Sequence, residues 1–136
     1  MDIMNSELLT ILFHAEKNRL YVTLRDFWPK GLETRTLSTQ LAQQLYEKLP
    51  QQTTLLLNIS RLKLMHPQVA EEVLYGLKFF TDIKEVRAIA AVEHPDYALV
   101  KLQFQRIAKH LGTPEGYPIG LFTNKDDAET WLDQVI

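Results

Sequence analysis

The stretch that most constrains the fold is residues 55–72, LLLNISRLKLMHPQVAEE, where a continuous apolar run leads into a helical pattern. A short run that is apolar at nearly every position is typical of a parallel strand with both faces covered. In an open α/β sheet, the turn after such a strand is where ligands and catalytic groups gather. This turn holds His66, Pro67 and Gln68, without a nucleophile, a phosphate-binding loop or a metal-ligand cluster. The stretch therefore predicts a fold more clearly than an activity.

Alternating and helical patterns divide the whole chain into strands and helices. Residues 9–25 alternate with a period of two around a polar turn at Lys17 and Asn18, which predicts an antiparallel hairpin. The other predicted strands are residues 54–59, 86–92 and 119–122. The predicted helices are residues 36–49, residues 67–80, a helix opened by His94 and Pro95 that stops at Gly112, and a final helix capped by Thr123 or Asn124. The order ββαβαβαβα predicts a single α/β domain over residues 1–136, with one mixed, mostly parallel, five-stranded sheet.

Composition narrows the class of protein. A chain of 136 residues suits one domain with one core. Its 15 Lys and Arg are scattered among 17 Asp and Glu, so we expect no nucleic-acid partner. Cysteine is absent, which excludes disulfides and thiolate chemistry. No apolar run approaches the roughly 20 residues that span a bilayer, and the start of the chain lacks the basic residues of a signal peptide. We expect a cytoplasmic protein that needs no cofactor.

Two histidines occupy equivalent junctions. His66 and His94 each precede a proline where a predicted strand leads into a helix, so both should lie at the carboxyl edge of the sheet. They could act as a pair of acid–base or metal-binding groups, or each could simply cap or border a helix. No Asp or Glu stands at ligand spacing, so we expect no metal site and favour the capping role. Ser60 lacks the nucleophile elbow of a hydrolase, so we assign no catalytic residue and expect no enzyme.

Large apolar side chains that the core does not require gather in two places. Phe27 and Trp28 lie in a loop, where they either fold back over the core or form a wedge for a partner. The predicted 67–80 helix has an extra apolar stripe, Leu74, Tyr75 and Phe79. Both places follow strands whose ends share one edge of the sheet. We therefore expect the loop, the stripe and the two histidines to form one ligand-binding or partner-binding surface.

The sequence resembles the SpoIIAA-like family, which is related to the sulfate-transporter and anti-sigma-factor-antagonist (STAS) domains and to the CRAL-TRIO type of fold. The resemblance covers roughly residues 9–135. It rests on the opening hairpin, on LLLNISRL, which is similar to the family strand ending in Leu-Asp-Leu-Ser, and on the closing LFTNKDDAETWL. It implies helices mainly on one face of the sheet.

The same resemblance shapes the functional expectation. STAS antagonists have Asp-Ser-Ser-Gly after this strand, with one serine phosphorylated, whereas the matching positions here are His66, Pro67, Gln68 and Val69. The phosphorylatable serine is missing, and neither Pro67 nor Gln68 can carry the regulatory phosphate. We expect a non-enzymatic binding or regulatory module that contacts a protein partner or a second copy of itself. The CRAL-TRIO resemblance implies the alternative, binding of an apolar ligand or lipid with peripheral membrane association.

Overall fold

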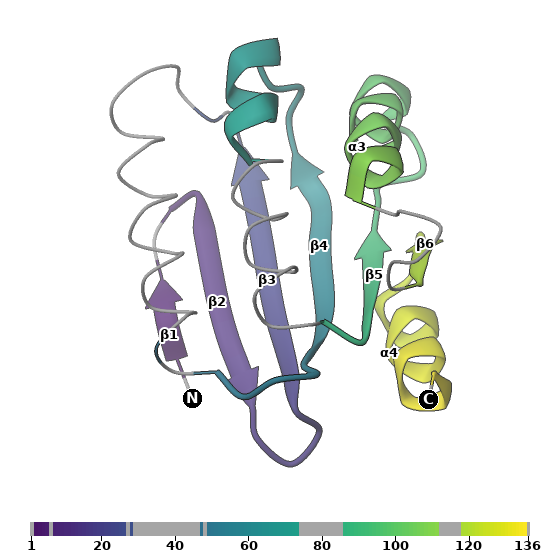
Figure 1. The fold of residues 1–136 in the computed structure, drawn as a ribbon. Helices are drawn as coiled ribbons and strands as arrows, with labels where there is room; N and C mark the ends of the chain where they lie inside the picture. Colours follow the sequence, from purple (N-terminus) through teal and green to yellow (C-terminus); the bar gives the residue numbers. More distant parts are fainter. Residues whose placement is uncertain are drawn as a thin grey trace.

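The computed structural model describes residues 2–5, 7–26, 28, 47, 49–73, 86–111 and 118–135. In these residues, six strands form one sheet in the order β1-β2-β3-β4-β5-β6 (Figure 1). The strands are β1 (Asp2–Asn5), β2 (Leu9–His14), β3 (Arg19–Asp26), β4 (Thr54–Leu62), β5 (Ala88–Val92) and β6 (Ile119–Phe122). The first three are antiparallel neighbours, and β3 to β6 run parallel to one another. The predicted fold class, a single mixed and mostly parallel α/β sheet, is confirmed.

All five predicted strands are present, and the structure adds β1 to them. This four-residue strand pairs antiparallel with β2. The sequence did not signal it because Asp2 and Asn5 are poor strand formers and the segment is too short to show a clear alternation. The predicted hairpin is β2–β3, and Asn18 in its turn has a positive φ of 49°. That conformation is one that asparagine tolerates better than most residues.

Strands β4 and β5 are buried on both faces. Leu55, Leu57 and Ile59 contribute to one core cluster, and Leu56 contributes to a second cluster on the opposite face. The five residues of β5 alternate between the same two clusters. Because side chains alternate along a strand, a continuous apolar run needs cover on both sides of the sheet. The apolar run therefore dictates a three-layer arrangement.

Three described helical segments supply that cover. Residues 67–73 and helix α3 (Ala98–Leu111) contribute Val69, Val100 and Phe104 to the larger cluster. Helix α4 (Lys125–Gln134) contributes Ala128 and Leu132 to the smaller one. Two described segments thus cover one face and α4 covers the other, in line with helices mainly on one face. The predicted helix 36–49 and the second half of the predicted 67–80 helix lie outside the described residues, apart from helical Glu47 and buried Leu49.

The starts of the helices follow the predicted capping in one case and not in another. Asn124 caps α4, since its Oδ1 accepts hydrogen bonds from the amides of Asp126 and Asp127. The prediction that His94 and Pro95 open the preceding helix is wrong, because α3 begins at Ala98. Residues 94–97 instead close a β-turn, in which the Tyr97 amide donates to the His94 carbonyl at 3.2 Å. Proline suits the second position of such a turn as well as it suits a helix start.

A buried arginine joins α4 to the sheet. Arg19 is 2% exposed, and its Nε donates to Thr54 Oγ1 at 3.0 Å. Its two terminal nitrogens donate to Glu129 Oε1 at 2.8 Å and to Asp133 Oδ1 at 2.9 Å. The Tyr21 hydroxyl also donates to Glu129, at 2.8 Å. The network satisfies a buried charge and fixes the orientation of α4 on the sheet.

The network also shifts the pKa of Glu129. Partial burial alone would raise this pKa, but hydrogen bonds from Tyr21 and Arg19 outweigh burial and lower it below the ordinary value of 4.5. A carboxylate with a lowered folded-state pKa stabilises the fold at pH values above its unfolded-state pKa. That stabilisation is lost as the pH falls through the folded-state value.

We expect Glu129→Gln to lower the free energy of unfolding by about 1–2 kcal/mol at neutral pH, because it removes the charge that Arg19 and Tyr21 bond. The difference from the parent should shrink as the pH falls below the ordinary pKa of 4.5. Chemical denaturation across this pH range measures both effects. Glu16→Gln, a charge removal in the exposed hairpin turn, is the matched control and should change little. Equal stability of Glu129→Gln and the parent at neutral pH would contradict the role given to this network.

Candidate functional site

The carboxyl edge of the parallel strands is the place where this fold displays side chains. Strands β3, β4, β5 and β6 end at Asp26, Leu62, Val92 and Phe122, and their parallel register brings these ends to one edge. Residues 67–73 and α3 stand at this edge, at the top of Figure 1. Trp28, His66 and His94 all follow strand ends here, as the sequence predicted.

His66 caps the helical segment that follows it. Its Nδ1 accepts the Gln68 amide at 3.2 Å, and its carbonyl accepts the Ala70 amide at 3.0 Å. These bonds satisfy amides that a helix start otherwise leaves open. The capping role favoured from the sequence fits this geometry.

His94 has a similar local role without starting a helix. Its Nδ1 accepts the Asp96 amide at 3.1 Å, and its ring stacks on Tyr97 with centroids 4.1 Å apart. Each histidine therefore has one ring nitrogen committed to its own turn. Among the described residues, no three His, Asp or Glu side chains gather closely enough to hold a metal ion.

Trp28 is buried in the core and does not form a surface wedge. It is 3% exposed and belongs to the larger core cluster, so the expectation of an exposed wedge is wrong and the alternative of burial is right. Its ring removes a large apolar area from water at the loop that leaves β3. The other residues of the expected surface, Phe27, Leu74, Tyr75 and Phe79, lie outside the described residues.

Ser60 lies within β4, seven residues before the helical segment begins at Pro67. Its hydroxyl donates to Asn58 Oδ1 at 2.7 Å, and its amide donates to the same oxygen at 3.0 Å. These bonds hold Ser60 in the strand. They do not present it at a helix start, where the dipole and free amides would favour a phosphate.

Glu93 is a buried carboxyl group that the sequence analysis did not single out. It directly follows β5, is 3% exposed, and has no hydrogen-bond partner for Oε2 among the described residues. Burial raises its pKa, and attraction to Lys101 offsets part of that rise. The sequence could have pointed to Glu93 through its position. It is a charged residue immediately after a wholly apolar strand, at the edge of the sheet where functional sites gather.

Helix α3 presents a second feature that the sequence analysis missed. Its inner side places Val100 and Phe104 in the core, whereas Leu99 and Leu102 are 64% and 54% exposed. Gln103 fixes the helix against the loop after β4, donating to the Met65 carbonyl at 2.7 Å and accepting the Met65 amide at 2.9 Å. This pair of bonds makes the exposed leucines a fixed part of the surface.

The spacing of apolar residues in the sequence could have indicated that these two leucines do not belong to the core. Val100, Phe104, Ile107 and Leu111 follow one another at steps of four, three and four residues, the spacing of one helical stripe, and Leu99 and Leu102 fall outside that stripe. Each large apolar residue that an amphipathic helix does not need for its core is a candidate for contact with something else. Tyr97 and Leu64, at 44% and 45% exposed, add to the apolar surface at this edge.

Comparison of the structures identifies the fold. A crystal structure at 2.25 Å resolution of an uncharacterised protein of the DUF3478 family from Shewanella loihica PV-4, described as having a SpoIIAA-like fold, matches 95% of this chain and 98% of its own chain. The TM-score is 0.63 and the sequence identity is 20%. This chain has a SpoIIAA-like fold. No protein-family model and no curated protein matches the sequence.

The SpoIIAA-like fold accounts for the arrangement of the sheet and helices but assigns no activity. Its carboxyl edge here combines a buried carboxyl group, two histidines held in turns, and an apolar outer surface on α3. None of the described helices is both long and apolar enough to cross a membrane.

We expect Glu93→Gln to stabilise the SpoIIAA-like fold by about 1 kcal/mol or more near neutral pH, because the amide removes the cost of a buried charge. The raised pKa gives the sign: Glu93 favours folding when protonated, and that contribution is lost as the pH rises through its folded-state pKa. The gain from Glu93→Gln should therefore grow with rising pH. Thermal or chemical unfolding from acidic to neutral pH measures it.

Asp96→Asn is the matched control for this test, since Asp96 is exposed in the turn three residues away. It should show no comparable growth in stability with pH. A Glu93→Gln variant that is less stable than the parent at neutral pH would mean that the ionised carboxylate is needed in the fold.

Proposed function

We propose that this protein is a non-enzymatic, STAS-like binding module that docks a protein partner on the outer side of α3, in the cytoplasm. The observation that carries the proposal is the exposure of Leu99 and Leu102 on a helix whose inner side is already packed. Two leucines held one turn apart on a fixed helix offer a preformed contact surface.

The energetics support such a role. Burying a leucine side chain fully contributes about 1.5–3 kcal/mol, so covering the exposed parts of two leucines supplies a useful share of a binding free energy. Four of the six exposed large apolar side chains among the described residues, Leu64, Tyr97, Leu99 and Leu102, follow β4 or β5 at the carboxyl edge. A gathering of this kind is more typical of an interaction surface than are single exposed apolar residues.

The chemistry of the edge supports binding over catalysis. The Nδ1 atoms of His66 and His94 accept backbone amides, and Ser60 donates to Asn58 instead of to a histidine. A nucleophile needs a base within hydrogen-bond reach, and Ser60 has its described bonds inside its own strand. The helix start at residues 66–69 also supports regulation without serine phosphorylation, because it contains no serine or threonine.

A photo-crosslinking experiment in the native cells tests the proposal. A photoreactive amino acid at position 99 should give a discrete adduct with another protein, because the partner covers Leu99. The same group at Leu12, which is exposed on β2, should not give that adduct. Adding Leu102→Ser should reduce the position-99 adduct about tenfold, as expected when a neighbouring contact is lost.

Mass spectrometry of the adducts separates the alternatives. Lipid adducts in place of protein adducts would favour the membrane-associated, apolar-ligand function that the CRAL-TRIO resemblance implies. Adducts only with second copies of the chain, or equal adducts at positions 99 and 12, would contradict a dedicated protein partner.

A further inference from the structure

We propose that the partner presents to α3 a helix that is apolar over one half and acidic over the other. This inference rests on the proposed function and adds the chemistry and shape of the partner. It is drawn from a stripe of four residues on α3, Leu99, Leu102, Arg106 and Lys109, which we call the outer stripe.

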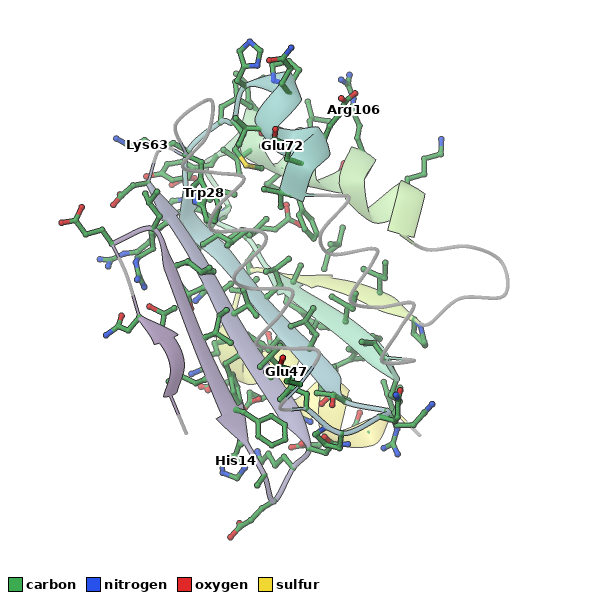
Figure 2. The ribbon with its side chains drawn as sticks, turned by 60° about the vertical axis from the view of Figure 1, so that its left-hand side comes forward. His14, Trp28, Glu47, Lys63, Glu72 and Arg106 are labelled. Atoms are coloured by element: carbon green, nitrogen blue, oxygen red, sulfur yellow. The ribbon has the colours of Figure 1, made fainter. Side chains whose placement is uncertain are left out.

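The outer stripe has the spacing of a helix-packing seam. Its members are separated by three, four and three residues, the same steps that place knobs along a coiled-coil seam. At 100° per residue they fall within a sector about 80° wide, on the side of the helix away from Val100 and Phe104. All four are exposed, and Arg106 points away from the sheet in Figure 2.

The stripe is divided by chemistry into two halves. Leucines occupy the amino-terminal half and cations occupy the carboxyl-terminal half. Among the described residues, neither Arg106 nor Lys109 takes part in an ion pair. Charge complementarity therefore calls for carboxylates opposite Arg106 and Lys109, and apolar side chains opposite Leu99 and Leu102.

The charge of α3 stands out from the rest of the chain. The helix holds three Lys and Arg and no Asp or Glu, whereas the remaining residues hold twelve Lys and Arg against 17 Asp and Glu. The other labelled cation near this edge, Lys63, projects on the far side of residues 67–73 from Arg106 in Figure 2. Lys63 therefore does not extend the outer stripe, which suits a narrow partner more than a broad anionic surface.

A helix fits the stripe better than an extended segment. The stripe spans the eleven residues from Leu99 to Lys109, a rise of about 15 Å, so a partner helix of roughly three turns can follow it from end to end. Side chains spaced at three and four residues on that helix meet those of the outer stripe in register. An extended strand has a repeat of two and meets such a seam at few points.

A second copy of α3 does not satisfy this seam. Parallel pairing of two α3 helices places Arg106 and Lys109 against the same cations of the other copy. Antiparallel pairing places these cations against Leu99 and Leu102. Like charges in contact and cations on leucine both oppose association, so the occupant is a different helix with carboxylates.

Two synthetic helical peptides of about 14 residues test the inference. One has leucines on one half of a stripe with the same spacing and glutamates on the other half, and its twin has lysines in place of the glutamates. By fluorescence anisotropy we expect the glutamate peptide to bind at least about tenfold more tightly than the lysine twin. Its affinity should fall as salt is raised.

Charge reversal of the protein supplies the matched variants. Arg106→Glu with Lys109→Glu should reverse the preference between the two peptides, because the carboxyl-terminal half of the contact depends on the sign of these side chains. Arg87→Glu reverses an exposed charge just before β5, at the opposite end of that strand from α3, and should leave the preference unchanged.

The outcomes separate this inference from the proposed function. Equal affinity for both peptides, or binding of neither, overturns the inference, while a protein adduct at position 99 still upholds the proposed function. Vesicles of phosphatidylglycerol form the third arm. If they bind the parent and not the doubly reversed variant, and the glutamate peptide does not compete with them, the surface recognises membranes and the inference is wrong.

Discussion

The fold depends on the burial of β4 and β5 on both faces. Leu55, Leu56 and Leu57 point alternately to opposite sides of the sheet, and each is 2% exposed or less. A single layer of helices cannot shield such a strand, so α3 must pack on one side and α4 on the other. Ala88 and Ala90 of β5 pack with Ala128 and Leu132 of α4, and Arg19 then anchors α4 through Glu129 and Asp133.

That constraint also decides where function can lie. Both faces of β4 and β5 are covered, so around these strands what remains for contact is the carboxyl edge and the outer sides of the covering helices. Trp28 was the prominent candidate in the sequence, yet the loop after β3 places it in the core. The inner side of helix α3 packs in the core, whereas two leucines and two cations are exposed on its outer side. Helix α3 is therefore the main candidate for contact with a partner.

The sequence predicted the features that follow from local pattern. The hairpin turn at Asn18, the apolar strands and the Asn124 cap each depend on residues close together in the chain. Strand β1 was not predicted because four residues are too few to show a clear alternation of apolar and polar side chains. The start of α3 was placed too early because a proline serves a turn and a helix start equally well. The burial of Trp28 and of Glu93 depends on packing between distant segments, so the sequence left the first open and did not reveal the second.

The central claim is that Leu99 and Leu102 are not needed for folding, whereas Trp28 is. Comparing the free energies of unfolding of Leu99→Ser/Leu102→Ser and Trp28→Ala by chemical denaturation tests this claim most directly. The double variant should stay within about 0.5 kcal/mol of the parent, as exposed sites do. Trp28→Ala should lose about 3–5 kcal/mol, the cost of a cavity in the core. A large loss in the double variant, or a small one in Trp28→Ala, would contradict the account and return Trp28 to the list of surface contacts.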